Sequence, residues 1–132
     1  FTYLIFIKLL DDKQLRSERD AILLGIEPKK FFNEDAYIEW HNTNERFTVD
    51  EFIKVNCTYP DKWGGEVERV EQIGNLFIAV AKVVNIFDKS SFYVNSFILL
   101  ENDRIVKLDE YWGDNGEIPQ WRIIKNIGVK IK

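Results

Sequence analysis

The spacing of apolar and polar residues changes along the chain, from helix-like in its first third to strand-like in its last two-thirds. Residues 12–26 repeat apolar side chains near the spacing of one helix face, among charged residues. Pro28 should end this helix, and residues 29–32 fit a short second one. The apolar residues 1–10 fit a helix or a strand equally well. The pattern predicts helices before strands.

A strand is predicted over residues 35–41, because apolar and polar side chains alternate there. Ala36, Ile38 and Trp40 fall on one face of this strand. A polar turn over residues 42–44 follows.

Thr48 has the sequence signature of a helix start. Thr48 and Glu51 have the spacing of a capping box, and Phe47 and Phe52 the spacing of a hydrophobic staple. Two signatures at one place predict a helix over residues 49–55.

From Glu66 onward the chain predicts an antiparallel meander. Gly74-Asn75 is a two-residue hairpin signal. Three further strands with short polar turns between them are predicted over residues 77–87, 92–100 and 104–112. The expected fold class is α+β, with N-terminal helices covering one face of a curved antiparallel sheet in a single domain over residues 1–132.

Composition narrows the function classes. The 132 residues carry a net charge of −4 with a pI of about 5.1, so a nucleic-acid surface is not expected. The chain has one cysteine, Cys57, and one histidine, His41, so neither a disulfide framework nor a metal site built from such ligands is expected. No cofactor is expected either.

Residues 1–10 are too short to span a bilayer and carry no leader signature, so a cytoplasmic protein with no membrane role is expected.

Several motifs resemble a known family. They are the Phe-x-x-Asp-Ala start of the first strand (residues 32–36), the helix from Thr48, Ser96-Phe97, and the ending Glu110-Tyr111-Trp112. Together they resemble the SnoaL-like branch of the nuclear-transport-factor-2-like superfamily, which includes ketosteroid isomerases and polyketide cyclases. The resemblance covers roughly residues 20–125.

The resemblance implies a cone: a strongly bent sheet, helices on its concave side, and a pocket between them. It also implies a homodimer through the convex sheet face. Family enzymes use a carboxylate base on the first strand and an acid on the fourth. Here those two positions hold Trp40 and Asn95, so the usual isomerase chemistry is not expected.

Glu110 is the candidate catalytic carboxylate. Strand pairing by the family pattern turns it inward if Ile38 and Trp40 face inward, and burial among rings would raise its pKa. Two alternatives stay open. Glu110 could have a structural role, for example in a pair with Arg122, or the opposite strand phase could turn Asp109 and Tyr111 inward instead.

Other candidates complete the predicted site. His41 could shuttle a proton with Glu110, or be a surface histidine. Tyr59 and Trp63 lie in a loop expected at the rim of the pocket, where they could grip a ligand or plug the opening. The predicted ligand-binding residues are Trp40, Trp63, Asn95, Phe97, Leu108 and Trp112.

Three functions are compatible with this sequence. The first is a protein that binds a small apolar or aromatic molecule in an aromatic-lined pocket. The second is an acid–base enzyme of the isomerase, cyclase, dehydratase or hydrolase type that uses Glu110 with His41 or Tyr59. The third is a dimeric interaction module whose pocket is filled by side chains.

Overall fold

A computed structural model describes residues 28–58, 60–61 and 63–132. The predicted helix over residues 12–26, residues 1–10 and Tyr59 lie outside this part. The described elements run in chain order as η1 (Pro28–Phe31), β1 (Phe32–Trp40), β2 (Glu45–Thr48), α3 (Val49–Thr58), β3 (Trp63–Ile73), β4 (Leu76–Asn85), β5 (Ser91–Glu101), β6 (Arg104–Asp114) and α4 (Gln120–Ile124).

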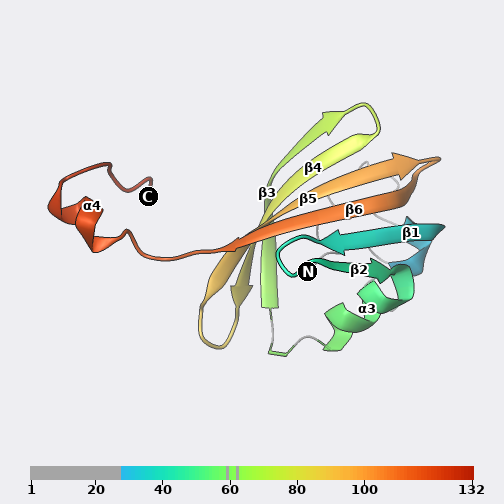
Figure 1. The fold of residues 1–132 in the computed structure, drawn as a ribbon, viewed down its shortest axis with the longest axis horizontal. Helices are drawn as coiled ribbons and strands as arrows, with labels where there is room; N and C mark the ends of the chain where they lie inside the picture. Colours follow the sequence, from blue (N-terminus) through green and yellow to red (C-terminus); the bar gives the residue numbers. More distant parts are fainter. Residues whose placement is uncertain (1–27, 59, 62) are drawn as a thin grey trace.

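The six strands form one strongly twisted sheet in the order β2-β1-β6-β5-β4-β3 (Figure 1). The α+β class is confirmed, with one difference from the expected antiparallel sheet: β1 pairs with β6 in parallel. Two parallel strands need a long connection, and the whole chain from β2 to β5 lies between these two. The last strand is therefore brought beside the first.

The two faces of the sheet differ in burial. The core face carries the alternate residues Ala36, Ile38 and Trp40 of β1, which are buried as their spacing predicted. The pairs Ile38↔Leu108 and Trp40↔Glu110 continue this face onto β6. On β5 it consists of Val94, Ser96 and Ile98. The opposite, outer face includes Tyr37, Glu39, Asn95, Phe97, Lys107, Asp109 and Tyr111.

The predicted start of α3 is confirmed in its hydrogen bonds. The Glu51 amide donates to Thr48 Oγ1 at 3.2 Å, and the Thr48 amide donates to Glu51 Oε1 at 3.0 Å. Phe47 and Phe52 are both buried and pack edge-on against the Trp40 ring. The helix start thus holds one side chain of the core face in place.

Strand β2 was not predicted. Its four residues carry only one buried side chain, Phe47, so they lack the repeated alternation that marks a longer strand. On the outer face, Arg46 of β2 lies opposite Glu39 of β1 and forms an ion pair with it, with 3.1 Å between Arg46 Nη2 and Glu39 Oε2.

The predicted turns of the meander are confirmed. Gly74 has a φ of 59°, and Asn102 and Asp103 have φ values of 49° and 63°, which suit two-residue hairpin loops. The strand predicted over residues 77–87 ends at Asn85, because the Asn85 side chain accepts a hydrogen bond from the Phe87 amide at 2.9 Å. An asparagine that bonds to the backbone two residues on starts a turn.

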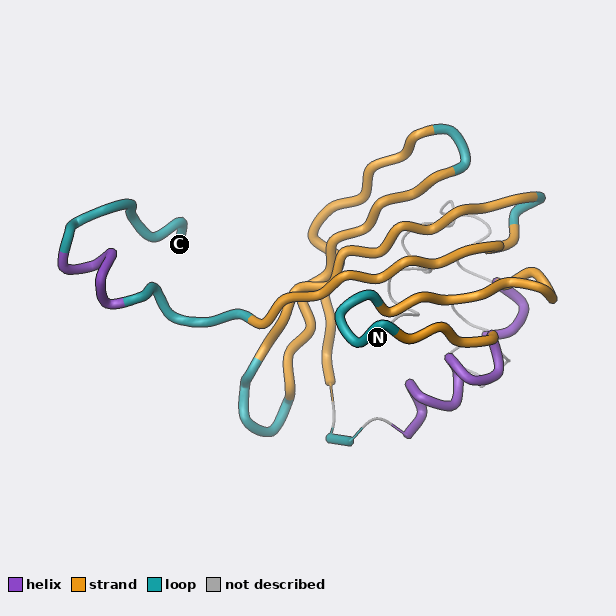
Figure 2. Tube along the Cα trace, viewed as in Figure 1, coloured by secondary structure: helices purple, strands orange, loops and turns teal. Residues whose placement is uncertain are grey.

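None of the described helices combines the length and the apolarity of a membrane span. Beyond β6, residues 115–132 run away from the sheet and include the short α4 (Figure 2).

The capping box gives a first prediction. Thr48→Ala removes the side-chain acceptor of the Glu51 amide and should lower the free energy of unfolding by about 1 kcal/mol. Urea denaturation measures this change. Thr58→Ala is the matched control at the other end of α3, where the hydroxyl bonds back to the Lys54 and Val55 carbonyls, and should cost less than about 0.5 kcal/mol. Equal losses in both variants would contradict a capping role for Thr48.

Candidate functional site

Glu110 is buried in the middle of the core face, with 2% of its surface exposed. The indole Nε1 of Trp40 donates a hydrogen bond to Glu110 Oε1 at 3.2 Å, and Ser96 Oγ donates to Oε2 at 2.8 Å. No lysine or arginine among the described residues forms an ion pair with this carboxylate. Arg122, the partner weighed from the sequence, lies instead over the ring of its neighbour Trp121, at 5.4 Å.

Burial raises the pKa of Glu110 above its ordinary value of 4.5. The cause is desolvation, which disfavours a charged carboxylate in the core. The hydrogen bonds from Ser96 and Trp40 act in the opposite direction, because both stabilise the ionised form, but they are the smaller effects. Glu110 therefore holds a proton to higher pH than an exposed glutamate would.

The two oxygens of Glu110 are not equivalent. An indole N–H can only donate, so Trp40 keeps Oε1 as an acceptor. A serine hydroxyl can donate or accept, so Ser96 tolerates a proton on Oε2 as well as its absence. Proton exchange by Glu110 would therefore take place at Oε2.

A pocket of about 150 Å³ adjoins Glu110. Its wall includes Trp40 and Trp112, whose rings meet edge-on at 5.2 Å, and Trp63, which meets Phe92 in the same way at 5.6 Å. The lining residues are Trp40, Trp63, Phe92, Val94, Glu110, Trp112 and Asp114. This volume resembles that of an apolar cavity that holds one benzene ring.

The backbone beyond β1 fixes the position of Glu110 and Trp112. The His41 amide donates to the Glu110 carbonyl at 3.1 Å. The Asn42 side chain then forms two hydrogen bonds with the Trp112 backbone: its Nδ2 donates to the carbonyl, and its Oδ1 accepts from the amide at 2.8 Å. Asn42 continues the ladder where β1 has ended, so the end of β6 stays against β1.

The structure brings together part of the predicted site. Trp40, Trp63, Glu110 and Trp112 surround the pocket. Leu108 is fully buried on the core face but does not line the pocket.

Asn95 and Phe97 do not join this group, and their placement by sequence is corrected. Asn95 pairs with Tyr111 in the ladder on the outer face, where the Phe97 ring meets the Tyr111 ring edge-on at 5.8 Å. Strand alternation gives the reason: the core face of β5 already carries Val94, Ser96 and Ile98. Because Glu110 is the buried residue, the opposite phase of β6, with Asp109 and Tyr111 inward, is excluded.

His41 also lies on the outer side, away from Glu110. Its ring stacks on Tyr111, with the centroids 4.2 Å apart, and its Nε2 lies 2.7 Å from Asp109 Oδ1. A proton relay between His41 and Glu110 does not fit this placement, because the two side chains occupy opposite faces of the sheet. Tyr59, the other suggested partner of Glu110, lies outside the described residues.

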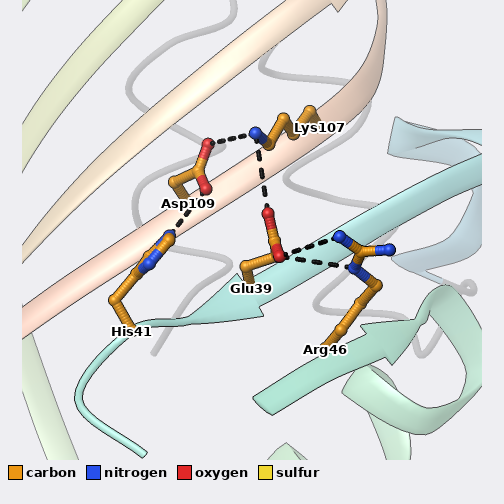
Figure 3. A network of polar contacts seen from close by, with 5 residues as sticks. All are labelled: Glu39, His41, Arg46, Lys107 and Asp109. Carbon is orange, nitrogen blue, oxygen red and sulfur yellow. Dashed lines mark hydrogen bonds and ion pairs between the residues drawn. The ribbon is translucent and has the colours of Figure 1, made fainter. Parts of the chain in front are cut away.

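Figure 3 shows the polar network around His41. Lys107 Nζ lies 3.6 Å from Glu39 Oε1 and 3.4 Å from Asp109 Oδ2, and Arg46 pairs with Glu39 from the other side. Ligand atoms of Glu39, His41 and Asp109 lie within 4.8 Å of one another, a spacing that could suit a metal. However, Lys107 and Arg46 already balance the two carboxylates. We therefore interpret the group as an ion-pair network on the outer face.

Sequence reasoning missed Ser96, the hydroxyl partner of Glu110, and the pocket-lining residues Phe92, Val94 and Asp114. A signal for Ser96 was present, because it shares the strand phase of Val94 and Ile98 in an apolar run. A polar residue in a buried phase needs a hydrogen-bond partner. That partner is Glu110, directly opposite in the β5–β6 ladder.

The raised pKa of Glu110 gives a second prediction. In the pH range above 4.5 and below the folded-state pKa, the folded protein binds more protons than the unfolded chain, so its stability falls as pH rises. Glu110→Gln imitates the protonated acid and removes this titration. The variant should therefore gain stability over wild type as pH rises through this range, by about 1.4 kcal/mol for each pH unit.

Urea denaturation at a series of pH values measures this difference. The control is Glu101→Gln, which removes an exposed carboxylate at the end of β5. It leaves Glu110 in place, so its stability should show the same fall with rising pH as that of wild type. If the difference between Glu110→Gln and wild type does not vary with pH, burial does not raise the Glu110 pKa.

This chain is similar to solved structures of known fold. No family model and no curated protein matches this chain. Among solved structures, a nuclear-transport-factor-2-like protein of unknown function from Burkholderia xenovorans matches with a TM-score of 0.62 at 24% identity, over 77% of this chain and 78% of the other.

Two further similar structures bear names of enzyme families. A candidate ketosteroid isomerase from Kribbella flavida has a TM-score of 0.65 at 17% identity, over 78% of this chain and 74% of the other. A candidate polyketide cyclase from Sinorhizobium meliloti has a TM-score of 0.60 at 18% identity, over 80% of this chain and 98% of the other. The fold implied by the sequence motifs is confirmed: this chain has the nuclear-transport-factor-2-like fold.

Proposed function

We propose that this protein binds a small, largely apolar or aromatic molecule in the pocket beside Glu110. The observation that carries the proposal is a buried carboxyl group at the wall of an aromatic-lined pocket. Ligand pockets commonly combine apolar walls with a few fixed polar groups. Here the Trp63, Phe92 and Trp112 rings supply the walls, and Glu110 supplies the polar group.

The size of the pocket limits the ligand. About 150 Å³ holds a single six-membered ring with one or two substituents. The rings lining the pocket favour a planar ligand, because they can contact its faces and edges. A hydroxyl or carbonyl on that ligand could pair with Glu110 Oε2, the oxygen that can carry or release a proton.

Acid–base catalysis by Glu110 is the second candidate. Its raised pKa favours this role, because a carboxyl group that titrates nearer neutrality can both take and return a proton. The chemistry would differ from that of the isomerases, whose first-strand base position is occupied here by the donor Trp40. Candidate isomerases and cyclases share the fold, but a fold alone does not establish activity.

The third candidate is a homodimer that forms through the outer face of the sheet. This face carries the Phe97 and Tyr111 rings beside the ion-pair network of His41, so it combines apolar and polar contacts. Dimerisation through this face is compatible with ligand binding, because the pocket lies on the core face. It differs in this from an interaction module whose pocket is filled by side chains. A dimer would therefore leave the pocket proposal unchanged.

Binding of ring-sized probes gives a third prediction. Phenol and toluene have similar size, but only phenol has a hydroxyl group that could pair with Glu110. Wild-type protein should bind phenol more tightly, and Trp112→Ala, which removes a pocket wall, should weaken phenol binding by about tenfold or more. Titration calorimetry or ligand-observed NMR measures both effects.

Phe97→Ala is the matched control, because it removes an aromatic side chain from a neighbouring strand on the opposite face. Phenol affinity should be unchanged in this variant. Equal losses in Trp112→Ala and Phe97→Ala, or no phenol binding by wild type, would contradict the proposed pocket.

The natural ligand can be sought by native mass spectrometry of protein purified from its own host. A retained small molecule would then be tested with wild type and Glu110→Gln. Conversion by wild type but not by Glu110→Gln would support the catalytic candidate. Equal conversion by both proteins would exclude Glu110 as the acid–base group.

A further inference from the structure

Residues 115–132 form a C-terminal arm that extends away from the sheet (Figures 1 and 2). The direction of the arm is fixed at its base. The Asn115 amide donates to the Ser91 carbonyl at 3.0 Å, and Asn115 Nδ2 donates to Ser91 Oγ at 2.9 Å. The arm thus leaves from an anchored point at the end of β6.

The arm exposes a large share of apolar side chains. Trp121 is 57% exposed, Ile124 74%, Val129 92% and Ile131 96%, and α4 has no buried residue. Scattered apolar residues are normal on a protein surface, but a contiguous group of this kind marks an interaction site. The full set of exposed apolar residues in the arm is Ile118, Trp121, Ile123, Ile124, Ile127, Val129 and Ile131.

The arm nevertheless has a defined conformation. Helix α4 ends in a Schellman motif, in which the Ile127 amide donates to the Arg122 carbonyl and the Asn126 amide to the Ile123 carbonyl, both at 3.0 Å. Asn126 has the required left-handed φ, 53°. A helix of five residues is too short to be stable alone in water, so it needs a surface to pack against.

Charge indicates what kind of surface that is. The arm has four cationic side chains and one carboxylate, a net charge of +3. Since the whole chain has a net charge of −4, residues 1–114 carry −7. A cationic, apolar arm suits the anionic body of the same protein, and in the described structure the arm extends away from its own body (Figure 1).

The last residues of the arm have the pattern of a strand. Ile127, Val129 and Ile131 alternate with Gly128, Lys130 and Lys132, which gives one apolar and one cationic side. No strand among the described residues pairs with this segment. An extended segment of this kind can pack on another sheet through its apolar side.

We propose that the arm of one copy packs on the outer sheet face of a second copy, and that the second copy returns the same contact. That face exposes Leu99 and Tyr111, with Phe97 beside them, which gives the arm an apolar surface. Reciprocal exchange of a segment is a low-cost route to a two-fold dimer. The inference rests on the proposed dimer through the outer face, and it adds the arm as the element that holds the dimer together.

Sedimentation velocity over a concentration series measures the first consequence. The variant Trp121→Ser/Ile124→Ser/Ile127→Ser changes only exposed side chains, so it should fold normally, and its dimer dissociation constant should rise by about 100-fold or more. The matched control is Ile73→Ser/Phe87→Ser, two exposed apolar residues outside the arm, which should leave the dissociation constant unchanged. Circular dichroism confirms that both variants are folded.

The position of the arm is tested by cross-linking. A photoreactive benzophenone side chain replaces Ile124, and unlabelled protein is mixed with ¹⁵N-labelled protein before irradiation. Cross-linked peptides that join a labelled to an unlabelled chain, at β5 or β6, support the exchange. Cross-links only within one chain, or none, overturn it.

The two measurements separate the possible failures. A dimer that withstands the arm variant and gives no cross-link between chains overturns the arm inference but keeps the sheet-face dimer. A monomer at all concentrations overturns both proposals. Cross-links between chains at another surface keep the exchange but overturn its location on the outer face.

Discussion

The hydrogen-bonded burial of the Glu110 carboxyl group is the constraint on which the rest of the site depends. A carboxyl group in an apolar core is costly unless its oxygens have partners, and Trp40 and Ser96 supply them. These two partners require β1 and β5 to lie on either side of β6 in a fixed register. The order of the central strands and the arrangement of the pocket are therefore two aspects of one requirement.

The same requirement gives the aromatic side chains their roles. Trp40 can donate to Glu110 only while its ring is held in place, and Phe47, Phe52 and Trp112 contact it edge-on. Phe47 and Phe52 flank the start of α3, so a local helix signal also orients a residue of the site. The high aromatic content of the chain thus serves both the core and the pocket wall.

Much of the fold could be predicted from sequence because its signals are local. The capping box at Thr48, the Gly74-Asn75 turn and the alternation in β1 each depend on residues close together in the chain. The parallel pairing of β1 with β6 was harder, because it depends on the register between strands that are distant in the chain. Asn95 and Phe97 were placed on the wrong face because their positions followed the family resemblance, although the alternation of Val94, Ser96 and Ile98 in β5 indicates the outer face. Glu110 was predicted because a carboxylate among rings is unusual, whereas Ser96 resembled an ordinary polar residue in a strand.

The two partners of Glu110 also differ in their separation from Glu110 along the chain. Ser96 is 14 residues from Glu110, and a single hairpin brings the two together. Trp40 is 70 residues away, and its contact needs the first strand to close against the last. Contacts between distant residues form slowly, because the intervening chain loses entropy before they are gained. During folding, the carboxyl group would thus acquire its hydroxyl partner with the hairpin and its indole partner only when the sheet is completed.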